Sequence, residues 1–62
     1  MNFIIVYPDE TERPLDGPIP RKGEMIKLDS YAQFKDGVFC VRHTGYISNA
    51  GKLFARVYLE YS

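Results

Sequence analysis

The chain has 62 residues, enough for one small domain with a single modest hydrophobic core. Eight Lys and Arg residues balance eight Asp and Glu residues, so no net charge attracts nucleic acid or an anionic membrane. A single cysteine, Cys40, excludes an intramolecular disulfide framework, and no apolar run is long enough to span a membrane. Since no basic segment precedes an apolar one at the start, we expect a reducing, cytoplasmic setting.

Residues 2–7 are apolar on both faces and rich in β-branched and aromatic side chains, which predicts a strand covered on both sides. Pro8 cannot donate to a strand ladder and ends it. Only one face of such a strand meets the core of a small domain, so a loop or another chain must cover the other face. An uncovered strand of this kind promotes aggregation, so we expect self-association.

Residues 8–23 hold all four prolines, two of the glycines and many charges, with only Leu15 and Ile19 as apolar anchors. This composition predicts a long loop that is ordered or semi-ordered. Within it, residues 13–20 partly resemble a polyproline ligand, but Asp16 and Gly17 interrupt the repeat.

Two strands are predicted in the middle of the chain. In residues 24–29, Ile26 and Leu28 alternate with other residues and are expected to face the core. Residues 30–35 form an irregular link or a short strand, and Asp36-Gly37 indicates a type I′ hairpin turn. The next strand covers residues 38–44.

The last part of the chain predicts a long hairpin. Gly45 breaks or bends the preceding strand, Tyr46-Ile47 can resume it, and residues 48–51 form a turn. Residues 52–61 then alternate between two faces, which predicts a single half-buried strand. One face carries Leu53, Ala55, Val57, Leu59 and Tyr61, and the other carries Lys52, Phe54, Arg56, Tyr58 and Glu60.

Four or five strands and no amphipathic helix of ten residues predict one all-β domain over residues 1–62, either a small barrel or a strongly bent antiparallel sheet. Tyr7, the acidic loop after it and the turn-and-strand segment 22–28 resemble the first half of the Src-homology-three barrel. Gly45-Tyr46-Ile47 is similar to a later segment of that fold. The chain lacks tryptophan and has Ser48 where that family has its groove proline, so the resemblance implies the architecture rather than proline-peptide binding. The same pattern resembles small barrels of bacteria and their phages.

Enzyme chemistry is not expected. Cys40 and His43 lie three apart on a predicted strand and should point to opposite faces, where they cannot form a nucleophile and base pair. The sequence has no zinc-ligand spacing, no phosphate-binding glycine loop and no nucleophile elbow, so we expect neither a metal nor a cofactor. The acidic residues of the long loop are interpreted as a solvated turn.

Binding to a protein is the preferred hypothesis. Phe54 and Tyr58 flank Arg56 on one strand face, a combination typical of interface hot spots, and Tyr7 and Tyr46 are added as candidate partner-binding residues. The opposite arrangement, in which the aromatic face is the core, stays open. The predicted function is a non-enzymatic small β-barrel interaction module that associates with itself or with another protein.

A weak single-stranded nucleic-acid-binding barrel is the alternative function. Bases would stack on the exposed aromatics while Arg42, Lys52 and Arg56 contact phosphates. The zero net charge disfavours it. Acidic residues are concentrated in positions 1–34, and bases are in excess in 35–62. We interpret this as a normal solvated surface; the alternative is that the two halves meet within the fold or between subunits.

Overall fold

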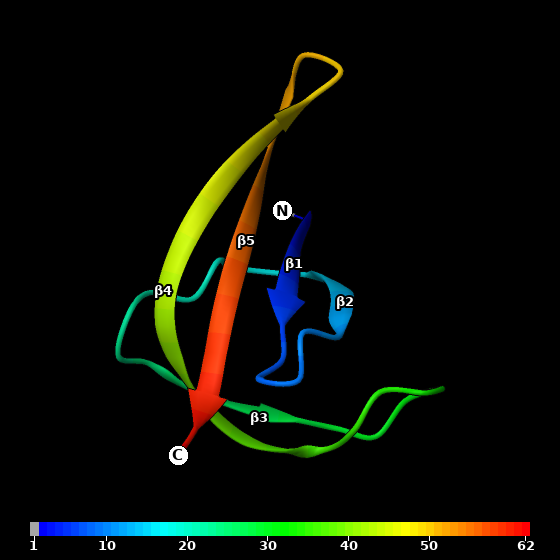
Figure 1. Cartoon of the computed structure of the whole chain (residues 1–62), viewed down its shortest axis with the longest axis vertical. Coiled ribbons are helices and arrows are strands. Elements are labelled where there is room, and N and C mark those ends of the chain that lie inside the picture. The colour runs from blue at the N-terminus through cyan, green and yellow to red at the C-terminus, as the bar shows by residue number, and fades with distance from the viewer. Residues whose placement is uncertain (1) are drawn as a thin grey trace.

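A computed structural model describes residues 2–62 and shows an all-β chain, as predicted (Figure 1). Its strands are β1 (Asn2–Val6), β2 (Glu12–Asp16), β3 (Met25–Leu28), β4 (Gly37–Asn49) and β5 (Lys52–Tyr61). They form one curled sheet, in the order β2-β1-β5-β4-β3, that resembles half of a barrel (Figure 1). Across residues 2–62 there is no helix of the length and apolarity needed to cross a membrane.

The sheet is mixed rather than wholly antiparallel. β1 pairs with β5 in parallel, with Phe3 opposite Ala55, whereas the other three neighbouring pairs are antiparallel. The turns between β1 and β5 reverse the chain an even number of times, so the two strands run in the same direction. Strand order therefore places the β1–β2 hairpin on one side of β5 and the β3–β4 hairpin on the other.

Part of the predicted long loop is a strand. β2 pairs antiparallel with β1, and Pro14 lies opposite Ile4. The interpretation of residues 8–23 as one loop was wrong because proline, although it lacks an amide donor, is tolerated on an edge strand. The β1–β2 turn is closed by the Tyr7 amide donating to the Thr11 carbonyl at 2.8 Å.

The predicted turn at Asp36-Gly37 is also wrong. The tight turn lies four residues earlier, where Tyr31 and Phe34 exchange two backbone hydrogen bonds and Ala32 has a positive φ of 52°. Gly37 instead begins β4 opposite Leu28. A Cβ at Gly37 would lie 3.1 Å from the Phe39 ring, so glycine is explained here by close packing as well as by its φ of 146°.

β4 passes through Gly45 without a break, but it contains a bulge. Its register with β5 shifts between Val41 and His43, which leaves Arg42 as the extra residue. Because the extra residue resets the alternation of side chains, Cys40 and His43 share one face of β4, opposite Glu60 and Tyr58 respectively. The prediction that they point to opposite faces was wrong.

The core lies on the concave face of the sheet. The predicted alternation of β5 is confirmed for Ala55, Val57 and Leu59, which are buried there, whereas Leu53 and Tyr61 near the two ends of the strand are exposed. The arrangement with the aromatic face as core is therefore contradicted. The other buried core side chains are Phe3, Ile5, Tyr7, Leu28, Phe39 and Val41, with Leu15, Ile19, Ile26 and Phe34 packed against them.

Candidate interaction surfaces

The convex face carries the predicted triplet of Phe54, Arg56 and Tyr58, and all three side chains are half-buried. Arg56 donates from Nη2 to Oε2 of Glu12 at 2.7 Å and from Nε to the Tyr58 hydroxyl at 3.2 Å. Glu12 lies on β2, two strands away, so the ion pair passes over β1. The triplet thus covers the second face of β1, where Val6 is buried. At Val6 the cover thus comes from within the chain, whereas Ile4 on the same face is half-buried.

Tyr58 is fixed from both sides. Its ring stacks on His43 with the centroids 4.4 Å apart, and the Arg56 guanidinium lies 5.8 Å from the ring centroid. The hydrogen bond from Arg56 holds the pKa of the Glu12 carboxyl below its usual value, and Glu12 in turn raises the pKa of Arg56. The predicted hot spot is therefore one cluster, but its polar groups are engaged within the chain.

Tyr7 is not at the surface. It is buried, its ring packs edge-on against Phe39, and its hydroxyl donates to the Lys35 carbonyl at 3.0 Å. The same hydroxyl accepts a hydrogen bond from Arg13 at 3.3 Å. Tyr7 is thus a core residue and offers no surface to a partner.

Arg13 is a buried charge that the sequence reasoning missed. It donates to the backbone carbonyl of Asp29 at 2.9 Å and to its carboxylate at 2.8 Å, and its guanidinium lies near the rings of Tyr31 and Phe34. The hydrogen bond from Arg13 lowers the pKa of Asp29. This contact joins β2 to the segment after β3, so we interpret Arg13 as structural rather than as part of a binding site.

The far end of the β4–β5 hairpin extends beyond the rest of the sheet, as Figure 1 shows. The described part of β1 begins near Ala55, and β3 pairs only with residues 37–40 of β4. We call residues 46–54 the arm. Three large apolar side chains are exposed on it: Tyr46 (58%), Ile47 (43%) and Leu53 (69%).

Tyr46 was predicted as a partner-binding residue and lies on the arm. Ile47 and Leu53 were missed. The alternation of residues 52–61 put Leu53 on the aliphatic face, and no face was assigned to Ile47, which lies opposite Phe54. The signal that identifies them is length: β5 has ten residues, and the β1 ladder accounts for only four of them, Ala55 to Tyr58. Leu53 lies on the same face of β5 as the buried Ala55 and Val57. It is exposed because β1 does not extend far enough to pair beside it.

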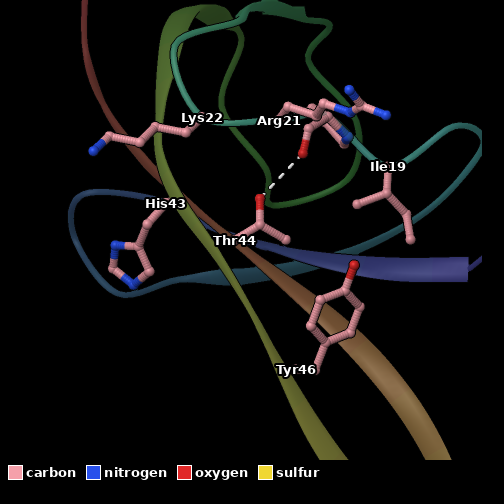
Figure 2. A pocket seen from close by; sticks show the side chains of 7 residues that line it. Ile19, Arg21, Lys22, His43, Thr44 and Tyr46 are labelled. Carbon is pink, nitrogen blue, oxygen red and sulfur yellow. Dashed lines mark hydrogen bonds between the residues drawn. The ribbon is translucent and has the colours of Figure 1, made fainter.

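A groove runs beside β4 where residues 19–22 approach it (Figure 2). It has a volume of about 520 Å³, and its wall includes three basic side chains and no acidic one. The Thr44 hydroxyl donates to the Pro20 carbonyl at 3.1 Å across its floor. Figure 2 shows Lys22 and His43 on one side of β4, and Arg21 with Tyr46 on the other.

The three bases predicted to contact phosphates are not brought together. Lys52 is next to the hairpin turn, whereas Arg42 lies at the bulge beyond Tyr58, about 20 Å farther along β5 at the usual rise of a strand. Arg56 lies between them and is paired with Glu12. Acidic residues of the first half and bases of the second meet within the fold, in the pairs Glu12–Arg56 and Asp9–Lys35.

Comparisons of the chain with protein-family models, curated proteins and solved structures found no match. The small all-strand architecture therefore rests on the structure alone. Within residues 2–62, no three His, Cys, Asp or Glu side chains gather where they could hold a metal ion. Cys40 directs its thiol to the Val41 carbonyl at 3.9 Å, while His43 stacks on Tyr58.

Proposed function

We propose that this chain is a non-enzymatic protein-interaction module that self-associates through its arm. The observation that supports the proposal is the exposure of Tyr46, Ile47 and Leu53 on a hairpin that projects past the sheet. Tyr46 and Leu53 lie on one face of this hairpin, and Ile47 lies with Phe54 on the other. Exposed large apolar side chains on a small domain are typical of an association surface. The convex triplet contributes at the base of the arm, where Phe54 lies opposite Ile47.

The energies favour a weak dimer. Complete burial of one large apolar side chain contributes about 1.5–3 kcal/mol, and association of two chains costs at least about 4 kcal/mol. A single arm residue is insufficient, whereas several arm residues from each of two copies exceed this lower bound. We therefore expect dissociation in about the micromolar range or above.

The proposal also includes a barrel type and a cellular setting. An assignment to the Src-homology-three type of barrel agrees with the curled sheet and with the Gly45-Tyr46-Ile47 segment, which lies in β4. A reducing, cytoplasmic setting is proposed from the single cysteine, Cys40, which is free. Binding of single-stranded nucleic acid remains the alternative, but the spacing of Arg42, Lys52 and Arg56 disfavours it.

The test is sedimentation equilibrium over a concentration series. We expect a concentration-dependent dimer from the unaltered chain and a monomer from Ile47→Ser with Leu53→Ser. The matched control is Met25→Ser with Val38→Ser, which replaces two exposed apolar side chains (58% and 45%) outside the arm and should leave the dimer intact. A chain that stays monomeric at millimolar concentration would contradict the proposal.

A further inference from the structure

The outer edge of β4 is occupied only along its first half. β3 pairs with β4 as far as Cys40, and beyond it Gly23 donates to the Val41 carbonyl while the Val41 amide donates to Glu24. At Thr44 the contact is reduced to one side-chain hydrogen bond, to Pro20. Farther along, no strand of residues 2–62 pairs with this edge.

The free part of this edge lies beyond the bulge at Arg42 and carries neither a proline nor a charged residue. Edge strands commonly carry proline or charged residues that discourage further strands. β2 has Pro14 and three charged residues, and β3 has Lys27. Residues 45–49 of β4 are Gly, Tyr, Ile, Ser and Asn, without a proline or a charge.

Two basic residues lie where the segment before β3 ends its contact with the outer edge of β4. Arg21 and Lys22 are exposed and form no ion pair with any of residues 2–62. Their side chains extend on opposite sides of β4, Lys22 on the side of His43 and Arg21 on the side of Ile19 and Tyr46 (Figure 2). Successive side chains of an added strand would also point to these two sides, because side chains alternate along a strand.

We propose that β4 binds an extended acidic peptide segment of a partner protein, which adds as a strand along residues 45–49. Its backbone would pair with the free edge, and two adjacent carboxylate residues at the end nearest Thr44 would meet Lys22 and Arg21. Backbone pairing supplies affinity in this mode of recognition and the side chains supply selectivity. The groove wall carries Arg21 and Lys22 and no acidic side chain, and the nearby Glu24 carboxylate accepts from the backbone amide of Arg21 and forms no ion pair with its guanidinium. This excess of positive charge is the complementarity that selects an acidic ligand.

The test is selection of random nine-residue peptides against the immobilised full chain. We expect enriched peptides with two adjacent Asp or Glu residues next to a β-branched or aromatic stretch. Arg21→Glu with Lys22→Glu should weaken a selected peptide at least tenfold. The control, Lys27→Glu with Lys52→Glu, changes the net charge equally outside the groove and should keep the affinity. Amide exchange of residues 45–49 should slow when the peptide binds.

Three results would overturn the proposal. One is the enrichment of no peptide, or of peptides without an acidic pair. Another is equal weakening by the control variant, which would indicate general electrostatic attraction. The last is equal binding of a nine-nucleotide single-stranded oligonucleotide with unchanged amide exchange in β4, which would favour phosphate recognition. Because Ile47 of the arm variant lies within residues 45–49, peptide binding is measured on the chain with an unaltered arm, at concentrations where that chain is monomeric. Failure of the dimer and failure of peptide binding are then separate results.

Discussion

Arg56 on β5 and Glu12 on β2 are joined at 2.7 Å although β1 lies between their strands. The pair crosses β1 where Arg56 lies opposite Ile4 and Glu12 opposite Val6. An apolar strand that seemed to require another chain is thus covered by a charged side chain, whose long aliphatic stem can pack on apolar surface. The second apolar face of β1 is therefore not an argument for self-association, which has to be argued from other residues.

Arg56→Ala should lower the midpoint of urea denaturation more than Glu12→Gln does. The alanine removes both the ion pair and the cover of β1, whereas the glutamine removes only the charge and leaves the stem of Arg56 in place. Equilibrium unfolding followed by circular dichroism measures the difference. Equal losses would show that the stem contributes nothing beyond the ion pair.

Arg13→Ala should destabilise the fold by about 2 kcal/mol, because it removes charge-assisted hydrogen bonds from a side chain that is only 7% exposed. A chain of this length has a stability of only about 3–5 kcal/mol, so the variant should be partly unfolded near physiological temperature. Thermal unfolding tests this. Tyr7→Phe is the milder comparison, since it keeps both contacts of Arg13 with Asp29. A larger loss for Tyr7→Phe than for Arg13→Ala would contradict the structural role assigned to Arg13.

Stability should fall as the solution is acidified. The hydrogen bond from Arg56 lowers the pKa of Glu12 from its ordinary 4.5, and that from Arg13 lowers the pKa of Asp29 from its ordinary 3.8. A carboxylate with a lowered pKa in the folded state stabilises the fold above its unfolded pKa, and this contribution is lost as the pH falls through the folded pKa. The urea midpoint should therefore drop between about pH 5 and pH 3. Glu12→Gln with Asp29→Asn should flatten that drop, and an unchanged slope would refute the assignment.

The hairpin turn offers a stabilising substitution. Ala50 and Gly51 both have positive φ, 53° and 77°, as a two-residue type I′ turn requires. A residue with a Cβ costs roughly 1 kcal/mol there, and asparagine tolerates the conformation better than alanine. Ala50→Asn should raise the unfolding free energy by about 0.5–1 kcal/mol, whereas Gly51→Ala should lower it. Denaturant titration decides, and a loss for Ala50→Asn would mean that the turn is not of this type.

The sequence predicts the apolar strands well and the polar ones poorly. β1 and β5 follow from alternation and β-branched composition, and the hairpin turn from residues 48–51. β2 was missed because Pro14 and its charged neighbours are typical of loops as well as of edge strands. The tight turn was misplaced because Asp36-Gly37 matches a turn motif locally, whereas packing against the Phe39 ring determines why glycine lies there.

The surfaces were harder to predict than the strands. The alternation correctly put Phe54, Arg56 and Tyr58 on one face, but the pairing of Arg56 with Glu12 depends on strand order, which periodicity does not encode. The bulge at Arg42 placed Cys40 and His43 on one face for a similar reason. The exposure of Leu53 could not be deduced without knowing where its neighbouring strand lies.

The parallel β1–β5 ladder has a consequence for the kinetics of folding. It joins Phe3 to Ala55, which are 52 positions apart, whereas the three antiparallel ladders connect strands that are consecutive in the chain. Closing so long a loop costs conformational entropy before the contacts of the core can stabilise the chain. The β1–β2 hairpin and the three-stranded β3–β4–β5 unit should therefore form early, and the rate of folding should be set by the step at which β1 docks along β5.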